Sequence, residues 1–88
     1  ITAAASSSIN DGAAALVLAS EDAAKANGLA PIATVVAHAT HAQQPEWFTT
    51  APVSAIEKVL AKAGWSVADV DVFEVNEAFA VVAMAPMK

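Results

Sequence analysis

Residues 71–85, DVFEVNEAFAVVAMA, join two stretches of opposite structural preference. Residues 71–75 contain two valines and a phenylalanine, which favour a strand, whereas the alanine-rich stretch from Glu77 onward favours a helix. Asn76 lies between them, where its side-chain oxygen can cap the helix, and Glu77 complements the positive end of the helix dipole. Ligands bind at such strand-to-helix junctions in open α/β sheets. The stretch therefore predicts both a fold element and a candidate site.

The composition limits the functions open to the chain. Nine carboxylates against four lysines give a formal net charge of -5, and arginine is absent, which excludes a nucleic-acid-binding surface. Without cysteine, these residues supply no disulfide, thiolate metal site or cysteine nucleophile. No apolar run reaches the length of a membrane span, so we expect a cytoplasmic protein without membrane contact.

The apolar content of 57% is high for a chain of 88 residues. A chain of this size buries only about two-thirds of its unfolded surface. We therefore expect much of the apolar surface to face neighbouring polypeptide or another subunit. The chain also opens at Ile1 rather than at a methionine, and Lys88 directly follows an expected helix. These features indicate an internal fragment of a longer chain.

Three apolar runs predict strands. They are residues 13–19 (AAALVLA), 32–40 (IATVVAHAT) and 71–75 (DVFEV). Helices are expected between and after them, so strands and helices alternate along the chain. This order is typical of an α/β fold in which helices pack on the faces of a layered sheet.

Start and stop signals define the helices. Ser20 is a favoured cap and Gly28 a favoured stop, which predicts a helix between them. A second, amphipathic helix is predicted to start at Thr50 or Ala51, with Pro52 in its first turn and Gly64 as its stop.

Two further signals lie near the carboxyl end. Ser66 and Asp69 have the spacing of a capping box, which predicts a single helical turn. Pro86 lacks an N–H and predicts a kinked or frayed end of the last helix.

The titratable residues do not form an evident catalytic or metal-binding set. His38 and His41 would point to opposite faces of a strand and have no third ligand nearby, so we expect no metal site. Asp69 is expected to cap a turn. Asp71 and Glu74 fall on opposite strand faces, so no acid/base pair is indicated.

Two polar features allow more than one interpretation. Ser6, Ser7 and Ser8 could include a nucleophile, but the G-x-S-x-G elbow is absent, and a polar loop is the better interpretation. Asn76 is neutral at any pH and offers both a donor and an acceptor, which suits a group that holds a water or a developing oxyanion. From the residues alone, a helix cap is the better interpretation.

Three phrases together resemble the thiolase family. They are SSINDGAAA (residues 7–15), APVSAI (residues 51–56) and VNEAFA (residues 75–80). They occur in the order found in thiolases, and the similarity extends over essentially the whole chain. The second phrase is nearer to the short-chain acetyl-CoA acetyltransferase type.

The resemblance implies a five-layered αβαβα fold. Residues 1–29 would end the amino-terminal domain, and residues 30–88 would begin the carboxyl-terminal domain. It also implies reversible cleavage of 3-ketoacyl-CoA by CoA, or the reverse Claisen condensation, through an acyl-cysteine intermediate. The full-length protein would be a homodimer or homotetramer.

The resemblance also assigns site residues. Asn76 matches the asparagine that holds a water in the oxyanion hole of thiolases, together with a histidine from a Gly-His-Pro phrase. Ala78 and Phe79 match positions that line the pantetheine and acyl end of the pocket. A coenzyme A thioester would be the substrate, with no covalently bound cofactor.

The chain departs from the family pattern at several points. The two catalytic cysteines and the histidine have no counterpart here, and Ala37 stands where thiolases have a CoA-contacting serine. We therefore expect the 88 residues alone to be inactive. One alternative is a non-catalytic CoA-pocket or dimer-contact module of thiolase descent. Another is a generic α/β structural segment in which Asn76 is only a cap.

Overall fold

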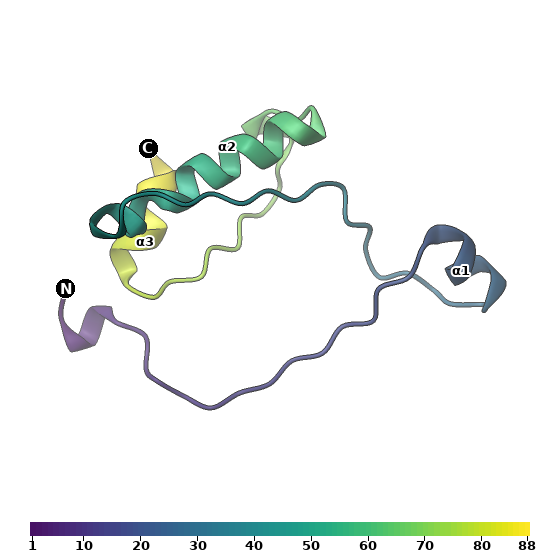
Figure 1. The fold of residues 1–88 in the computed structure, drawn as a ribbon, viewed down its shortest axis with the longest axis horizontal. Helices are drawn as coiled ribbons and strands as arrows, with labels where there is room; N and C mark the ends of the chain where they lie inside the picture. The colour runs from purple at the N-terminus through teal and green to yellow at the C-terminus, as the bar shows by residue number, and fades with distance from the viewer.

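The computed structural model describes residues 1–88, in which short helices alternate with long extended stretches (Figure 1). The α-helices are α1 (Glu21–Ala26), α2 (Ala51–Ala63) and α3 (Ala80–Met84). Shorter 3₁₀ turns are η1 (Ala3–Ala5), η2 (Pro45–Thr50), η3 (Val67–Asp69) and η4 (Ala85–Met87). Both α2 and α3 pack against η2 and η4, whereas α1 lies apart at the far end of the molecule.

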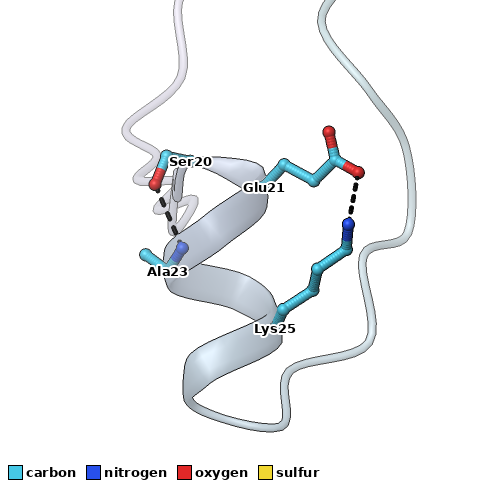
Figure 2. Close-up of polar contacts among 4 residues, drawn as sticks. All are labelled: Ser20, Glu21, Ala23 and Lys25. Carbon is cyan, nitrogen blue, oxygen red and sulfur yellow. Dashed lines mark hydrogen bonds and ion pairs between the residues drawn. The ribbon is translucent and has the colours of Figure 1, made fainter.

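Local contacts hold α1, as Figure 2 shows. The Ser20 side chain accepts a hydrogen bond from the Ala23 N–H at 3.2 Å, which satisfies one of the unpaired donors of the first turn. Lys25 Nζ lies 2.9 Å from Glu21 Oε1, one turn away. Both side chains are exposed, so this ion pair contributes only about 0.3–0.5 kcal/mol. The predicted helix and its cap are confirmed.

The helices α1 and α2 end in the same way. Gly28 and Gly64 adopt left-handed backbone angles, with φ of 63° and 70°. Each glycine N–H donates to the carbonyl three residues back, at 3.3 Å. The next residue, Leu29 or Trp65, donates to the carbonyl five residues back, at 2.9 and 3.0 Å. This is the Schellman arrangement, which confirms both predicted stops.

The amphipathic pattern of α2 is also confirmed. Five apolar residues at helical spacing are half-buried: Val53, Ile56, Val59, Leu60 and Ala63. The charged residues Glu57, Lys58 and Lys62 are exposed. Lys62 Nζ donates to the His38 carbonyl at 3.0 Å, so the stretch before η2 lies along this helix.

The predicted strands at residues 13–19, 32–40 and 71–75 are wrong for this structure. These residues run as extended chain without a sheet (Figure 1). The one β-bridge of the chain joins Ser6 and Phe79 in antiparallel orientation. Cross-strand pairing stabilises a sheet, and none of the three runs finds a partner strand within these 88 residues. The expected α/β sheet is therefore absent, although the expected helices form.

The predicted helix start at Glu77 is also wrong. The helix α3 begins at Ala80, and Asn76 does not cap it, because Phe79 occupies the capping position without a side-chain hydrogen bond. The reason lies far away in the sequence. Ser7 N–H donates to the Ala78 carbonyl at 3.0 Å, which takes an acceptor that an earlier helix would need.

Two other predictions near the carboxyl end are confirmed. Asp69 Oδ2 accepts from the Ser66 N–H at 2.7 Å and from the Ser66 hydroxyl at 2.9 Å, which closes the capping-box turn. The α-helical hydrogen-bond pattern stops at Met84, and η4 with Pro86 continues as a 3₁₀ turn.

Little apolar surface is buried. Ala24 and Val82 are the buried residues of the chain. Leu16 and Ile32, in two of the extended stretches, are 91% and 103% exposed. The helices therefore leave most of the large apolar side chains uncovered. No helix combines the length and the apolar character that crossing a membrane requires.

Candidate functional site

An open groove of about 520 Å³ lies between the first half of α2 and the stretch that leads into α3. Its lining is His41, Phe48, Ala51, Pro52, Ala55, Ile56, Phe73, Glu74, Val75, Asn76, Ala78 and Val82. Most of these side chains are apolar, and three are polar or titratable. Ligand sites commonly combine apolar walls with a few polar groups in this way.

Two of the three predicted site residues line the groove. Asn76 and Ala78 lie two residues apart, and both contribute to the lining. Phe79 is not among the lining residues. Its ring instead packs edge to face on Phe48, which does line the groove, with centroids 6.1 Å apart. Asn76 and Ala78 therefore line the groove directly, whereas Phe79 contacts a lining residue, Phe48.

The Asn76 carboxamide is free to bind a ligand. The residue is exposed, and none of the side-chain hydrogen bonds of the chain involves it. A primary amide offers two N–H donors and a carbonyl acceptor without carrying charge. It can hold a water or donate directly to an oxygen that becomes negative.

His41 lies at the groove with both ring nitrogens occupied. Nδ1 lies 2.9 Å from Lys58 Nζ, and Nε2 lies 3.0 Å from Gln43 Oε1. Because a lysine ammonium can only donate, these two contacts correspond to a ring whose Nδ1 accepts from Lys58 and whose Nε2–H donates to Gln43. Neither nitrogen is left for a metal ion. No group of three potential metal ligands occurs in the structure.

Gln43 extends this polar network to η2. Its amide donates to the Trp47 carbonyl and, at 2.8 Å, to the Thr50 hydroxyl. The Thr50 hydroxyl in turn donates to the Trp47 carbonyl at 2.9 Å. The network thus ties the stretch before η2 to the start of α2, which positions Phe48 at the groove.

The carboxylates have separate surroundings. Glu74 is the carboxylate among the groove residues, and Asp71 is not one of them. Asp69 lies in the capping turn, where hydrogen bonds from the Ser66 N–H and then the Ser66 hydroxyl hold the pKa of its carboxyl below the ordinary value. The groove therefore contains no close pair of carboxylates for concerted acid/base chemistry.

Sequence reasoning missed several groove residues. The sequence alone gives His41 no role, and its contact with Lys58 depends on how residues 38–41 lie along α2. Phe48 carried a signal, because adjacent aromatic residues in a loop suggest a docked segment. Its partner Phe79 could not be identified from sequence spacing.

The comparisons with known proteins agree with the motifs. Residues 29–88 match the thiolase C-terminal domain. Over all 88 residues, the chain is 52% identical to acetyl-CoA acetyltransferase 2 of Arabidopsis thaliana and 47% identical to the cytosolic acetyl-CoA acetyltransferase of Rattus norvegicus. It is 49% identical to the 3-oxoadipyl-CoA/3-oxo-5,6-dehydrosuberyl-CoA thiolase of Escherichia coli. The chain spans 22% of the length of each of these relatives. It belongs to the thiolase family, and residues 29–88 belong to the C-terminal domain of that family.

Proposed function

We propose that the chain forms part of an acyltransferase that reversibly cleaves 3-ketoacyl-CoA with CoA or condenses two acyl-CoA units. The observation that carries this proposal is the free Asn76 carboxamide on an apolar groove. Relatives named as acetyl-CoA acetyltransferases and as a 3-oxoadipyl-CoA thiolase support the substrate class, a coenzyme A thioester.

In this proposal, Asn76 stabilises negative charge on the thioester oxygen. Its amide holds a water that donates to the oxygen as the enolate forms. Ala78 leaves room for the pantetheine arm, and Phe79 supports the wall beside the acyl group. The acyl-accepting cysteine and the proton-transferring groups come from polypeptide beyond these 88 residues, because the chain contains no cysteine.

The finer architecture follows from the same proposal. Residues 1–29 would end the amino-terminal domain and residues 30–88 would begin the carboxyl-terminal domain of an αβαβα fold. The uncovered apolar runs support this assignment, because strands buried on both faces have this composition. A homodimer or homotetramer in the cytoplasm is the corresponding assembly. The name of the cytosolic rat relative supports that location.

A chimera tests the proposal. Residues 1–88 replace the matching segment of Arabidopsis acetyl-CoA acetyltransferase 2, and acetoacetyl-CoA cleavage is assayed. We expect the chimera to turn over and Asn76→Asp to lower kcat by about 10²–10³-fold, because a carboxylate repels the developing oxyanion. Asn10→Asp is the matched control, since Asn10 is exposed and lies outside the groove.

Two outcomes would count against the proposal. Unchanged turnover in Asn76→Asp would leave Asn76 without a role in the chemistry. A chimera that folds, as judged by circular dichroism, but does not cleave acetoacetyl-CoA would favour the non-catalytic module. The 88 residues alone are expected to show no turnover.

A further inference from the structure

Ser7 attaches the amino-terminal stretch to the residues that follow Asn76. Its N–H donates to the Ala78 carbonyl at 3.0 Å, and its hydroxyl donates to the Glu77 carbonyl, 70 residues away in sequence. The neighbouring residue Ser6 forms an antiparallel bridge with Phe79. Together these contacts fasten the amino-terminal stretch along residues 77–79.

The three consecutive serines have different roles. The Ser6 hydroxyl donates to the Thr2 carbonyl at 2.6 Å, within its own turn. The Ser8 side chain is exposed and takes part in none of the hydrogen bonds of the chain. Only Ser7 joins the two distant segments through its side chain. Its hydroxyl is already bonded to a carbonyl, so a nucleophilic role has no support.

The two Ser7 bonds fix the backbone on both sides of Ala78. The Glu77 carbonyl belongs to the peptide unit before Ala78, and the Ala78 carbonyl belongs to the unit after it. With both units held, the chain bends at Ala78 and α3 starts only at Ala80. Asn76 and Ala78, on either side of Glu77, both line the groove.

We propose that Ser7 is a positioning residue that fixes the peptide units on both sides of Ala78 and so directs the Asn76 carboxamide into the groove. This inference rests on the proposed function of Asn76. A donor to an oxyanion works only at the correct position, and a displacement of about 1 Å costs up to about 100-fold in rate. Without the Ser7 hydroxyl, the Glu77 carbonyl loses its partner and only the backbone contacts of Ser6 and Ser7 hold this segment, so residues 77–79 join the alanine-rich helix more readily.

The test uses the chimera with Ser7→Ala, Ser7→Thr and Ser8→Ala. We expect Ser7→Ala to lower kcat about 10- to 100-fold with a small change in KM, because substrate binding keeps the other groove contacts. Ser7→Thr retains the hydroxyl and is expected to restore most of kcat. Ser8→Ala is the matched control and is expected to match the parent.

A double-mutant cycle separates this inference from the proposed function. If Ser7 acts through Asn76, Ser7→Ala adds no further loss once Asn76→Ala is present. Independent, multiplicative losses would overturn the positioning role and leave the role of Asn76 intact. Full activity of Asn76→Ala would instead overturn the proposed function.

Hydrogen exchange gives a readout that does not depend on activity. Amides of residues 76–82 are expected to exchange faster in Ser7→Ala than in Ser8→Ala or the parent. Equal exchange in all three proteins would overturn the inference, even if Ser7→Ala lowered activity for another reason.

Discussion

Phe48 and Phe79 pack edge to face, with ring centroids 6.1 Å apart and ring planes at 61°. The contact joins η2 to the residue just before α3, across 31 positions of the sequence. Phe48 also lines the groove that contains Asn76. The aromatic pair therefore couples the wall of the groove to the segment that presents the proposed oxyanion group.

The Phe48 and Phe79 rings are expected to stabilise each other. An edge-to-face pair contributes about 0.5–1.5 kcal/mol beyond the burial of its area. Urea unfolding of the chimera with Phe48→Leu, Phe79→Leu and the double variant measures this coupling. Trp47→Leu is the control, because Trp47 is 63% exposed and has no ring contact with Phe79. Additive losses for the Phe48 and Phe79 variants would show that the contact contributes nothing.

The left-handed glycine after α2 is expected to resist substitution. A Cβ at Gly64 would meet no atom within 4 Å, so the cost of Gly64→Ala comes from its φ of 70° alone. That cost is about 1–2 kcal/mol. Gly12→Ala is the control, since Gly12 has equal space and no positive φ. Urea unfolding of the chimera compares the two, and equal midpoints would contradict the backbone explanation.

The parts of the fold that sequence predicts are those fixed by near neighbours. Ser20 and Gly28 bound α1, and Gly64 ends α2, because caps and stops act over a few residues. The start of α3 is different. It depends on a contact with Ser7, about 70 residues away, and local sequence propensities do not predict contacts between distant residues. Strand prediction fails for a related reason, because a strand exists only beside a partner.

The residues of the candidate site show the same difference between local sequence signals and long-range contacts. Asn76 and Ala78 were identified because their phrase is continuous in sequence, and both line the groove. Phe79 belongs to the same phrase but supports the wall through Phe48. His41 also lines the groove, where it contacts Lys58, 17 residues away. That contact depends on how the chain lies along α2.

The tautomer of His41 is expected to depend on Lys58. The ammonium lies 2.9 Å from Nδ1 and favours the form with the proton on Nε2. Nitrogen-15 chemical shifts of the neutral ring in the chimera measure the proportion of each tautomer. Lys58→Met should reduce the preference for the Nε2–H form, whereas Glu57→Gln, at the adjacent exposed position, should not. An unchanged tautomer ratio in Lys58→Met would exclude a contribution from this contact.

The capping turn at Ser66 and Asp69 is expected to weaken in acid. The Ser66 N–H and hydroxyl hold the pKa of the Asp69 carboxyl below its ordinary value, because both hydrogen bonds favour the charged form. A group whose native pKa is lowered stabilises the folded state fully above its unfolded pKa, which is about 3.9 for aspartate. That contribution is lost as the pH falls through the lower native pKa.

The contacts span three residues, so nuclear magnetic resonance titration of the 88-residue chain can follow the Asp69 side chain directly. Ser66→Ala removes the hydroxyl donor and keeps the N–H, so the titration midpoint should rise part of the way towards the ordinary value. A midpoint that does not move would show that the backbone N–H alone lowers the pKa.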